Sequence, residues 1–137
     1  MNIACCLESS RSAAEIAAFP GKLSIVENKL RHHETPSFGA SNYLANILLD
    51  ARVHDNSKTA ILNIHPGDNL EKIEVICEEL DLNLTFATKG ELTPHQGIDI
   101  ILDEGSFGWV PALYILAHNP LELVDRMHQI ITHINSK

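Results

Sequence analysis

Metal ligation is the chemistry that this sequence offers most readily, because its 137 residues include eight histidines and three cysteines. Imidazole and thiolate groups are good ligands for zinc, iron and iron–sulfur clusters. The sequence contains no Cys-x-x-Cys or His-Glu-x-x-His motif, so spacing alone selects no ligand set. Single histidines are usually surface or capped core residues. His65 differs, because it ends a predicted strand and precedes Pro66-Gly67, a turn that opens a predicted helix.

Nucleophilic chemistry is a second possibility, in the segment from Cys5 to Ser12. A cysteine followed by five residues, Arg11 and a serine resembles the loop of low-molecular-weight phosphatases and related arsenate reductases. In those families a thiolate attacks phosphorus while backbone amides and the arginine hold the oxyanion. This segment lacks glycine, carries Glu8 beside the expected phosphate and is followed by no Asp-Pro pair. We favour a buried strand cysteine and a surface arginine, with Cys5 and Arg11 as the alternative catalytic pair.

Acidic residues lie within and directly after the predicted strand 98–102, and an aromatic residue comes after them. Asp99, Asp103 and Glu104 are placed where carboxylates hold magnesium in phosphoryl-transfer sites, although solvated capping residues have the same pattern. The next loop, from Gly105 to Trp109, carries the only tryptophan. It suits a ligand lid, a subunit contact or a loop packed under the last helix. The apolar stretch behind this loop favours a homodimer.

Alternating strands and helices must bring these residues together. The patterning predicts strands over 2–7, 22–26, 30–35, 59–64, 82–87 and 98–102, and helices over 13–18, 40–51, 70–80 and from Pro120 after an Asn119 cap. The unit from 59 to 87 has strand–helix–strand spacing, so its two strands are expected to run parallel. Ligands gather at the carboxyl ends of parallel strands, which selects four loops: 8–12, 36–39, 65–68 and 103–108.

These elements predict a single α/β domain over residues 1–137, with one mixed sheet of about five to six strands flanked by helices. The formal charge of −8 disfavours a nucleic-acid partner. Three cysteines, an odd number, indicate no disulfide framework and favour a cytoplasmic protein. The longest apolar run, 109–117, is far shorter than the roughly 20 residues of a membrane span, so no membrane contact is expected.

Several segments resemble the dinitrogenase iron–molybdenum cofactor biosynthesis family. They are Asn2-Ile3-Ala4 and the stretches 19–28, 36–40 and 60–69. The resemblance implies a ribonuclease H-like α/β fold and a small module that carries or binds a metal cluster or its precursor. The ligands that it implies are Cys5, Cys6, His32, His33 and His65.

The sequence therefore favours a cytoplasmic binding or carrier module for an iron–sulfur or other metal cluster over an enzyme. His65 and Gly67 are the expected cofactor-binding residues. The phosphatase-like pair and a non-catalytic dimerisation or regulatory module remain alternatives. Neighbouring strand residues point to opposite faces, so Cys5 and Cys6 are not expected to serve one site, and the strand register decides which is exposed.

Overall fold

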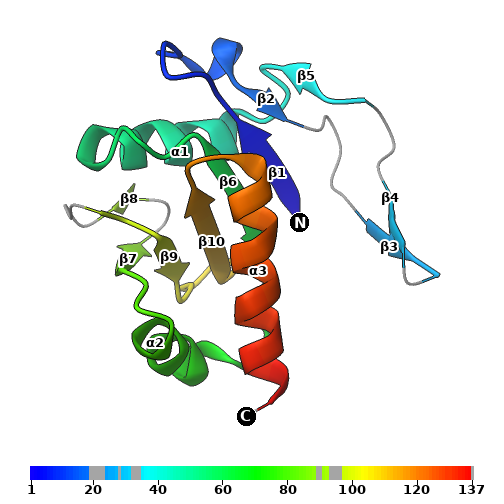
Figure 1. Cartoon of the computed structure of the whole chain (residues 1–137), viewed down its shortest axis with the longest axis vertical. Coiled ribbons are helices and arrows are strands. Elements are labelled where there is room, and N and C mark those ends of the chain that lie inside the picture. The colour runs from blue at the N-terminus through cyan, green and yellow to red at the C-terminus, as the bar shows by residue number, and fades with distance from the viewer. Residues whose placement is uncertain (19–23, 28, 32–34, 89–90, 93–96, 137) are drawn as a thin grey trace.

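The computed structural model describes residues 1–18, 24–27, 29–31, 35–88, 91–92 and 97–136. Within them, an eight-stranded mixed sheet lies between helix α1 (Asn42–His54) on one face and helices α2 (Leu70–Glu79) and α3 (Pro120–Asn135) on the other (Figure 1). The predicted single-domain α/β fold with a mixed sheet flanked by helices is confirmed. The sheet has eight strands where about five to six were expected. No helix in these residues is long and apolar enough to span a bilayer.

The first strands and the middle of the sheet come from the N-terminal two-thirds of the chain. They are β1 (Asn2–Cys5), β2 (Ala17–Ala18), β3 (Ser24–Val26), β4 (Lys29–Arg31), β5 (Ser37–Phe38), β6 (Ala60–Ile64), β7 (Leu84–Thr88) and β8 (Glu91–Leu92). The remaining strands are β9 (Ile100–Asp103) and β10 (Ala112–Ala117). The order in the large sheet is β5-β2-β1-β6-β10-β9-β7-β8, while β3 and β4 form a separate hairpin that projects from the body (Figure 1).

Strand directions decide which loops meet. In the large sheet β7 and β9 pair in parallel, and the other described neighbours are antiparallel. β6 and β7 therefore run in the same direction, as predicted, but β10 and β9 lie between them. We call the end of the sheet where β6, β7 and β9 finish the carboxyl end, and the opposite one the amino end. β1 is antiparallel to β6, so Cys5 pairs with Ala60 at the amino end.

Strand β10 was missed by the sequence analysis, which treated its residues as an apolar stretch favouring a homodimer. From Leu113 to Ala117 the side chains are at most 1% exposed, because β6 and β9 flank the strand and helices cover both faces. Such a strand shows no alternation of polar and apolar residues. Pro111 directly precedes the strand, where its missing N–H costs no ladder hydrogen bond. These side chains form the core and offer no contact surface.

Two of the three long helices begin at a residue whose side chain caps the first turn. Asn119 Oδ1 accepts a hydrogen bond from Glu122 N at 2.9 Å, and Pro120 begins α3 as predicted. The Ser41 hydroxyl accepts from Leu44 N at 3.4 Å at the start of α1. At α2, Asn69 occupies the cap position without a side-chain cap bond.

The predicted helix over 13–18 is wrong. Ala13–Glu15 form one 3-10 turn, η1, and Ala17 and Ala18 then pair with β1 as strand β2. A segment this short gains more from joining a sheet than from an isolated helical turn. The predicted antiparallel return after the turn at Glu27 is confirmed for β3 and β4. Residues 19–23 and 32–34, which complete the predicted strands, lie outside the described residues.

Candidate functional site

A cleft of about 450 Å³ opens at the carboxyl end of the sheet, where α1 begins, β6 ends and β1 and β10 start. A volume of this size suits a small-molecule ligand. We call it the α1 cleft, and its lining residues are Met1, Asn2, Ala40, Ser41, Tyr43, Leu44, Asn63, Ile64, His65, Val110, Pro111 and Ala112. Of the four loops expected at this end, 65–68 and 103–108 are there, because they follow β6 and β9. Loop 36–39 runs beside β2 at the level of Cys5 before it leads into α1, and loop 8–12 is at the amino end, because β1 runs against β6.

A row of polar side chains crosses three neighbouring strands at the floor of the α1 cleft. Asn2, Asn63 and Tyr114 lie directly opposite one another in β1, β6 and β10. They share the face of the sheet that packs against α1, since Ala4 and Ile61, two residues along, belong to the core on that side. Asn2 N donates to Asn63 Oδ1 at 2.7 Å, which fixes the Asn63 carboxamide. Side-chain amides in a half-buried row give a ligand both donors and acceptors.

Two tyrosines join the helix to this row. The hydroxyl groups of Tyr43 and Tyr114 are 2.6 Å apart, so one donates to the other. Burial of Tyr114, followed by its hydrogen bond to Tyr43, raises the pKa of its phenol far above the usual value. Tyr114 is therefore a neutral hydroxyl. Tyr43 is 45% exposed and presents its ring to the cleft.

An aromatic wall is held in place by a buried carboxyl group. The rings of Tyr43 and Trp109 are 6.0 Å apart and tilted by 55°. The indole Nε1 of Trp109 donates to Asp103 Oδ2 at 2.9 Å, and Gly105 N donates to Oδ1 at 2.9 Å. Asp103 is 2% exposed, so this end of the loop is rigidly anchored.

The start of α1 contributes positive electrostatic potential. Ser41 caps the helix, and Gly39 before it has φ +72°, a left-handed conformation that favours glycine. The Gly39 amide donates to Ile16 O at 3.0 Å, which ties this turn to η1. The first-turn amides of a helix point outward and, with the helix dipole, attract phosphate groups.

His65, singled out from the sequence, lies on the rim of the α1 cleft. Its Nδ1 accepts a hydrogen bond from Gly67 N at 2.9 Å, and Gly67 adopts φ +61° to make that turn. With Nδ1 accepting, the neutral ring carries its proton on Nε2, which becomes a donor. Gly67 thus orients His65, and among the described residues His65 is part of no group of three side chains that could hold a metal ion.

Of the predicted metal ligands, the three that the structure describes, Cys5, Cys6 and His65, are not brought together. Cys5 packs in the core beneath α2 and α3, whereas Cys6 packs on the α1 side, as their adjacent positions require. Burial raises the pKa of both thiols, the neighbouring Cys6 raises that of Cys5 further, and Arg52 partly offsets the rise at Cys6. Both are half-buried at the amino end, opposite His65. His32 and His33 lie outside the described residues.

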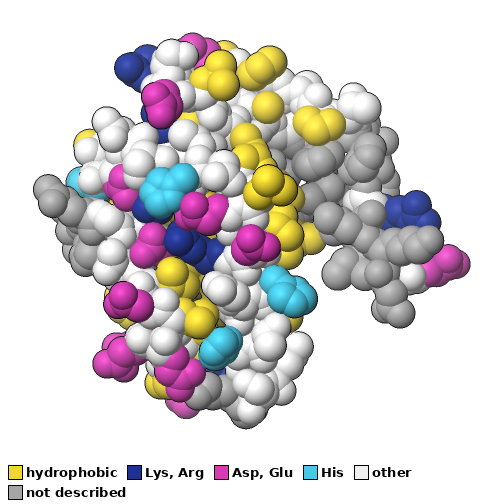
Figure 2. Space-filling view, viewed as in Figure 1, with side chains coloured by type: hydrophobic (Ala, Val, Ile, Leu, Met, Phe, Trp, Pro, Cys, Tyr) yellow, Lys and Arg dark blue, Asp and Glu magenta, His cyan; other side chains and the backbone are white. Residues whose placement is uncertain are grey.

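Asp99, an acidic candidate from the sequence, has a structural role. Asp99 receives hydrogen bonds from Asn83 N and Arg126, and Lys58 Nζ lies 3.4 Å from it. Figure 2 shows charged side chains of both signs and histidines gathered beside the start of α3, where this network lies. Within the described ranges, no three His, Cys, Asp or Glu side chains are arranged to hold a metal ion.

The Cys5–Arg11 pair does not form a phosphatase loop. The Arg11 guanidinium donates to the backbone oxygens of Glu8 and Ser10 at 2.9 and 3.0 Å. The Cys5 side chain packs into the core on the α2 and α3 face, and its thiol pKa is raised by burial, so it supplies no thiolate.

Comparison with known proteins gives one family. The family model described as thiamine-phosphate synthase ThiN matches residues 1–129. The C-terminal domain of protein MJ0236 has a TM-score of 0.81 and 23% identity, covering 98% of this chain and 82% of that one. The C-terminal domain of a phosphomethylpyrimidine kinase has a TM-score of 0.80 and 20% identity, covering 94% of this chain and 83% of that one. These likenesses show a shared fold. No curated protein matches the chain.

The family match overturns three predictions from the sequence. The chain is not related to the dinitrogenase cofactor family, and it is neither a metal-cluster carrier nor a cysteine-dependent phosphatase. The resembling segments were short strand-and-turn patterns, such as β6 with its following loop, which many α/β proteins share. The ribonuclease H-like expectation came from that family and loses its support with it.

Most residues of the α1 cleft were missed by sequence reasoning. One signal was present: Asn63 is a polar residue inside the apolar strand 60–64, and such a residue often marks a site. Ser41 was available as a helix cap beside the expected loop 36–39. Nothing in the sequence pairs Asn2 with Asn63 or Tyr43 with Tyr114, because those pairings depend on strand order.

Proposed function

The chain belongs to the ThiN family, and we propose that it acts in thiamine-phosphate synthesis, with thiamine phosphate held in the α1 cleft. The family match over residues 1–129 carries this proposal. The α1 cleft supports it, because its polar and aromatic groups complement the three chemical parts of thiamine phosphate: a phosphate, an aminopyrimidine and a cationic thiazolium ring.

The phosphate group is placed at the start of α1. The first-turn amides and the Ser41 cap lie on one side of the cleft, and His65 lies on the other. A helix N-terminus stabilises an anion by about 0.3–1 kcal/mol, and each hydrogen bond to a charged group adds about 1.5–3 kcal/mol. His65 Nε2 supplies such a donor.

The two rings are placed deeper in the cleft. Asn2 and Asn63 present carboxamide groups whose donors and acceptors match those of an aminopyrimidine edge. The exposed ring of Tyr43, backed by Trp109, offers a π face to the cationic ring. A cation over an aromatic face gains about 0.5–2 kcal/mol. The buried carboxyl of Asp103 behind Trp109 makes that wall more favourable to a cation.

We further propose that the protein acts in the cytoplasm and as a homodimer, without a nucleic-acid or membrane partner. The three cysteines are free thiols, in keeping with a reducing compartment.

The exposed apolar side chains Phe107 and Val110, beside the α1 cleft, favour a second copy as partner. Light scattering of the purified chain at two concentrations tests the dimer, and a monomer at both would contradict it.

The synthase proposal is tested by measuring formation of thiamine phosphate from its pyrimidine and thiazole precursors. The wild-type protein is expected to form thiamine phosphate over repeated catalytic cycles. His65→Ala should lower kcat/KM by roughly 10-fold or more, because it removes a hydrogen bond to phosphate. His128→Ala, an exposed histidine on α3, is the matched control and should leave kcat/KM unchanged.

Three results contradict the proposal in whole or in part. Absence of product together with absence of thiamine-phosphate binding overturns it entirely. Turnover that is equal in His65→Ala and His128→Ala removes the α1 cleft as its location. Binding without turnover retains the ligand and the cleft, and rejects the catalytic part.

A further inference from the structure

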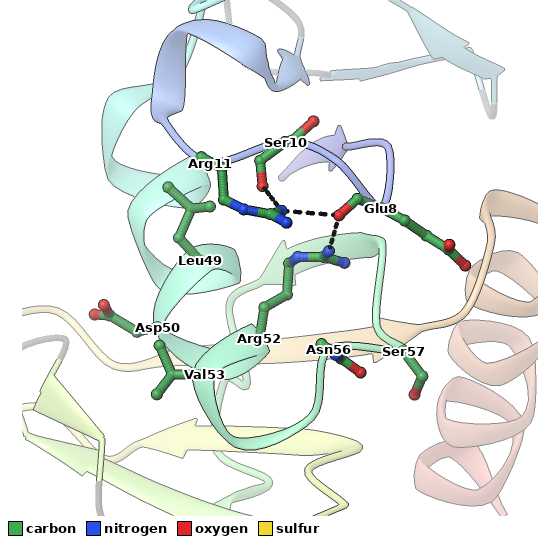
Figure 3. A pocket seen from close by; sticks show the side chains of 9 residues that line it. All are labelled: Glu8, Ser10, Arg11, Leu49, Asp50, Arg52, Val53, Asn56 and Ser57. Carbon is green, nitrogen blue, oxygen red and sulfur yellow. Dashed lines mark hydrogen bonds between the residues drawn. The ribbon is translucent and has the colours of Figure 1, made fainter.

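A second cavity, of about 620 Å³, lies at the amino end of the sheet, at the opposite end of α1 from the α1 cleft. Figure 3 shows it between the loop that follows β1 and the last turns of α1. The loop supplies Glu8 and Arg11, and the helix supplies Leu49, Arg52 and Val53. We call it the arginine cavity.

Two guanidinium groups from separate segments meet on one backbone oxygen in this cavity. Arg11 Nη1 donates to Glu8 O at 2.9 Å, and Arg52 Nη2 donates to the same oxygen at 3.0 Å (Figure 3). Across the described residues, neither guanidinium forms an ion pair with a carboxylate. The carboxyl groups of Glu8 and Asp50 border the cavity but point away from both arginines (Figure 3).

The two arginines differ in burial and in the segments that they join. Arg52 is 9% exposed, and its Nη1 donates to Lys58 O at 2.6 Å, so it ties two loops to the end of α1. The negative end of the helix dipole also favours a cation there. Arg11 is exposed and comes from another segment; its guanidinium donates to Glu8 O and Ser10 O, backbone oxygens of its own loop, and the shared Glu8 O brings it beside a buried like charge. Two like charges on one acceptor repel each other, and an anion bound between them relieves that repulsion.

We propose that the arginine cavity binds a phosphate monoester, a function separate from that of the α1 cleft. Guanidinium groups match phosphate geometry. A phosphate dianion balances the charge of two guanidinium groups better than a single carboxylate would. The Asn56 side chain lines the cavity and makes no hydrogen bond to other described residues, so it offers a further donor. Leu49 and Val53, the latter 80% exposed, form an apolar wall for the organic part of the ligand.

The test is a titration of the full chain with phenyl phosphate, followed by backbone amide chemical shifts in NMR. Saturable shifts are expected in residues 8–11 and 49–57. Arg11→Gln should weaken that binding at least 10-fold, and because Arg11 is exposed the variant should fold as the wild type does. Arg31→Gln, another exposed arginine, is the matched control and should not change the affinity.

Three outcomes overturn the proposal: no saturable shift in these residues, shifts confined to the α1 cleft, or equal affinity in Arg11→Gln and wild type. His65→Ala separates the two sites, because it should leave the shifts in 8–11 intact. A parallel titration with inorganic phosphate tests the apolar wall. Tighter binding of phenyl phosphate supports that wall, and equal affinity rejects a monoester in favour of the free anion.

Discussion

Asp103 fixes the aromatic wall of the α1 cleft through two charge-assisted hydrogen bonds. Its carboxyl is buried and accepts from the Trp109 indole and from the Gly105 amide, one donor on each oxygen. Gly105 has no room for a side chain, since an added Cβ would lie 2.8 Å from Trp109 O, and its φ of +81° favours glycine. The loop therefore has one conformation around this carboxyl group.

Replacing this carboxyl by an amide tests the arrangement. Asp103→Asn leaves one oxygen and turns an NH₂ group toward one of the two donors, so one buried hydrogen bond is lost. We expect the free energy of unfolding in urea to fall by about 1–3 kcal/mol. Asp125→Asn, an exposed aspartate on α3, should change it by less than about 0.5 kcal/mol. Equal effects of the two substitutions would show that Asp103 has no anchoring role.

Single residues were predictable from the sequence only where the chemistry is local. The Asn119 cap and the turn at His65-Pro66-Gly67 depend on neighbours in the chain, and both are present. Asp103 was weighed as a magnesium ligand or a solvated capping residue; it is buried, and its carboxyl accepts from the Gly105 amide and the Trp109 indole. Its indole partner is six residues away, across a turn whose geometry the sequence does not specify.

Among the elements, α1 and α3 are joined by a network of ion pairs at the amino end. Lys58 is 3% exposed, and its Nζ lies 2.7 Å from Asp55 and 3.4 Å from Asp99. Asp99 also lies 3.3 Å from Arg126, which in turn lies 3.2 Å from Glu122. A buried ammonium group needs such partners, so losing one of them destabilises the fold.

Asp55 makes this network sensitive to acid. Burial alone would raise its pKa, but hydrogen bonds from Lys58 and Ser57 and the Lys58 charge lower it from 3.8 to about 2. A depressed pKa contributes stability that is present above about pH 4 and is lost as pH falls toward 2. Because solvent screens this carboxyl group, its contribution at neutral pH is about 1 kcal/mol.

The corresponding experiment compares urea unfolding of wild type and Asp55→Asn between pH 7 and pH 2. We expect the variant to be less stable by about 1 kcal/mol at pH 7, with the difference shrinking as pH falls below 4. Asp125→Asn should show no such convergence. A difference in unfolding free energy that stays constant from pH 7 to pH 2 would mean that the contact with Lys58 does not lower the pKa of Asp55.

Helices were better predicted than strands, for physical reasons. α1, α2 and α3 carry an apolar stripe that is read directly from spacing. β10, buried on both faces, has no such pattern, and β2 and β5 are two-residue strands defined by their partners. Pairing across the sheet is a long-range property, which residue spacing does not contain.

Over the whole molecule, strand order decides which of the candidate residues meet. The sequence correctly indicated an α/β domain with a mixed sheet, but its four candidate loops do not all lie at one end of that sheet. Because β1 runs against β6, Cys5 and Arg11 lie at the amino end and His65 at the carboxyl end, so no shared site is formed. The same topology produces two cavities, one at each end of α1, with different chemistry.

The most direct test of the proposed function is a titration of the full chain with thiamine phosphate, followed by the fluorescence of Trp109, its only tryptophan. Trp109 packs against Tyr43, which lines the α1 cleft, so it reports binding there. We expect a saturable change, with affinity roughly 10-fold lower in Tyr43→Ala because the aromatic contact is lost, and unchanged in His128→Ala. The absence of a saturable change, or equal affinity in wild type and Tyr43→Ala, would contradict binding of thiamine phosphate in this cleft.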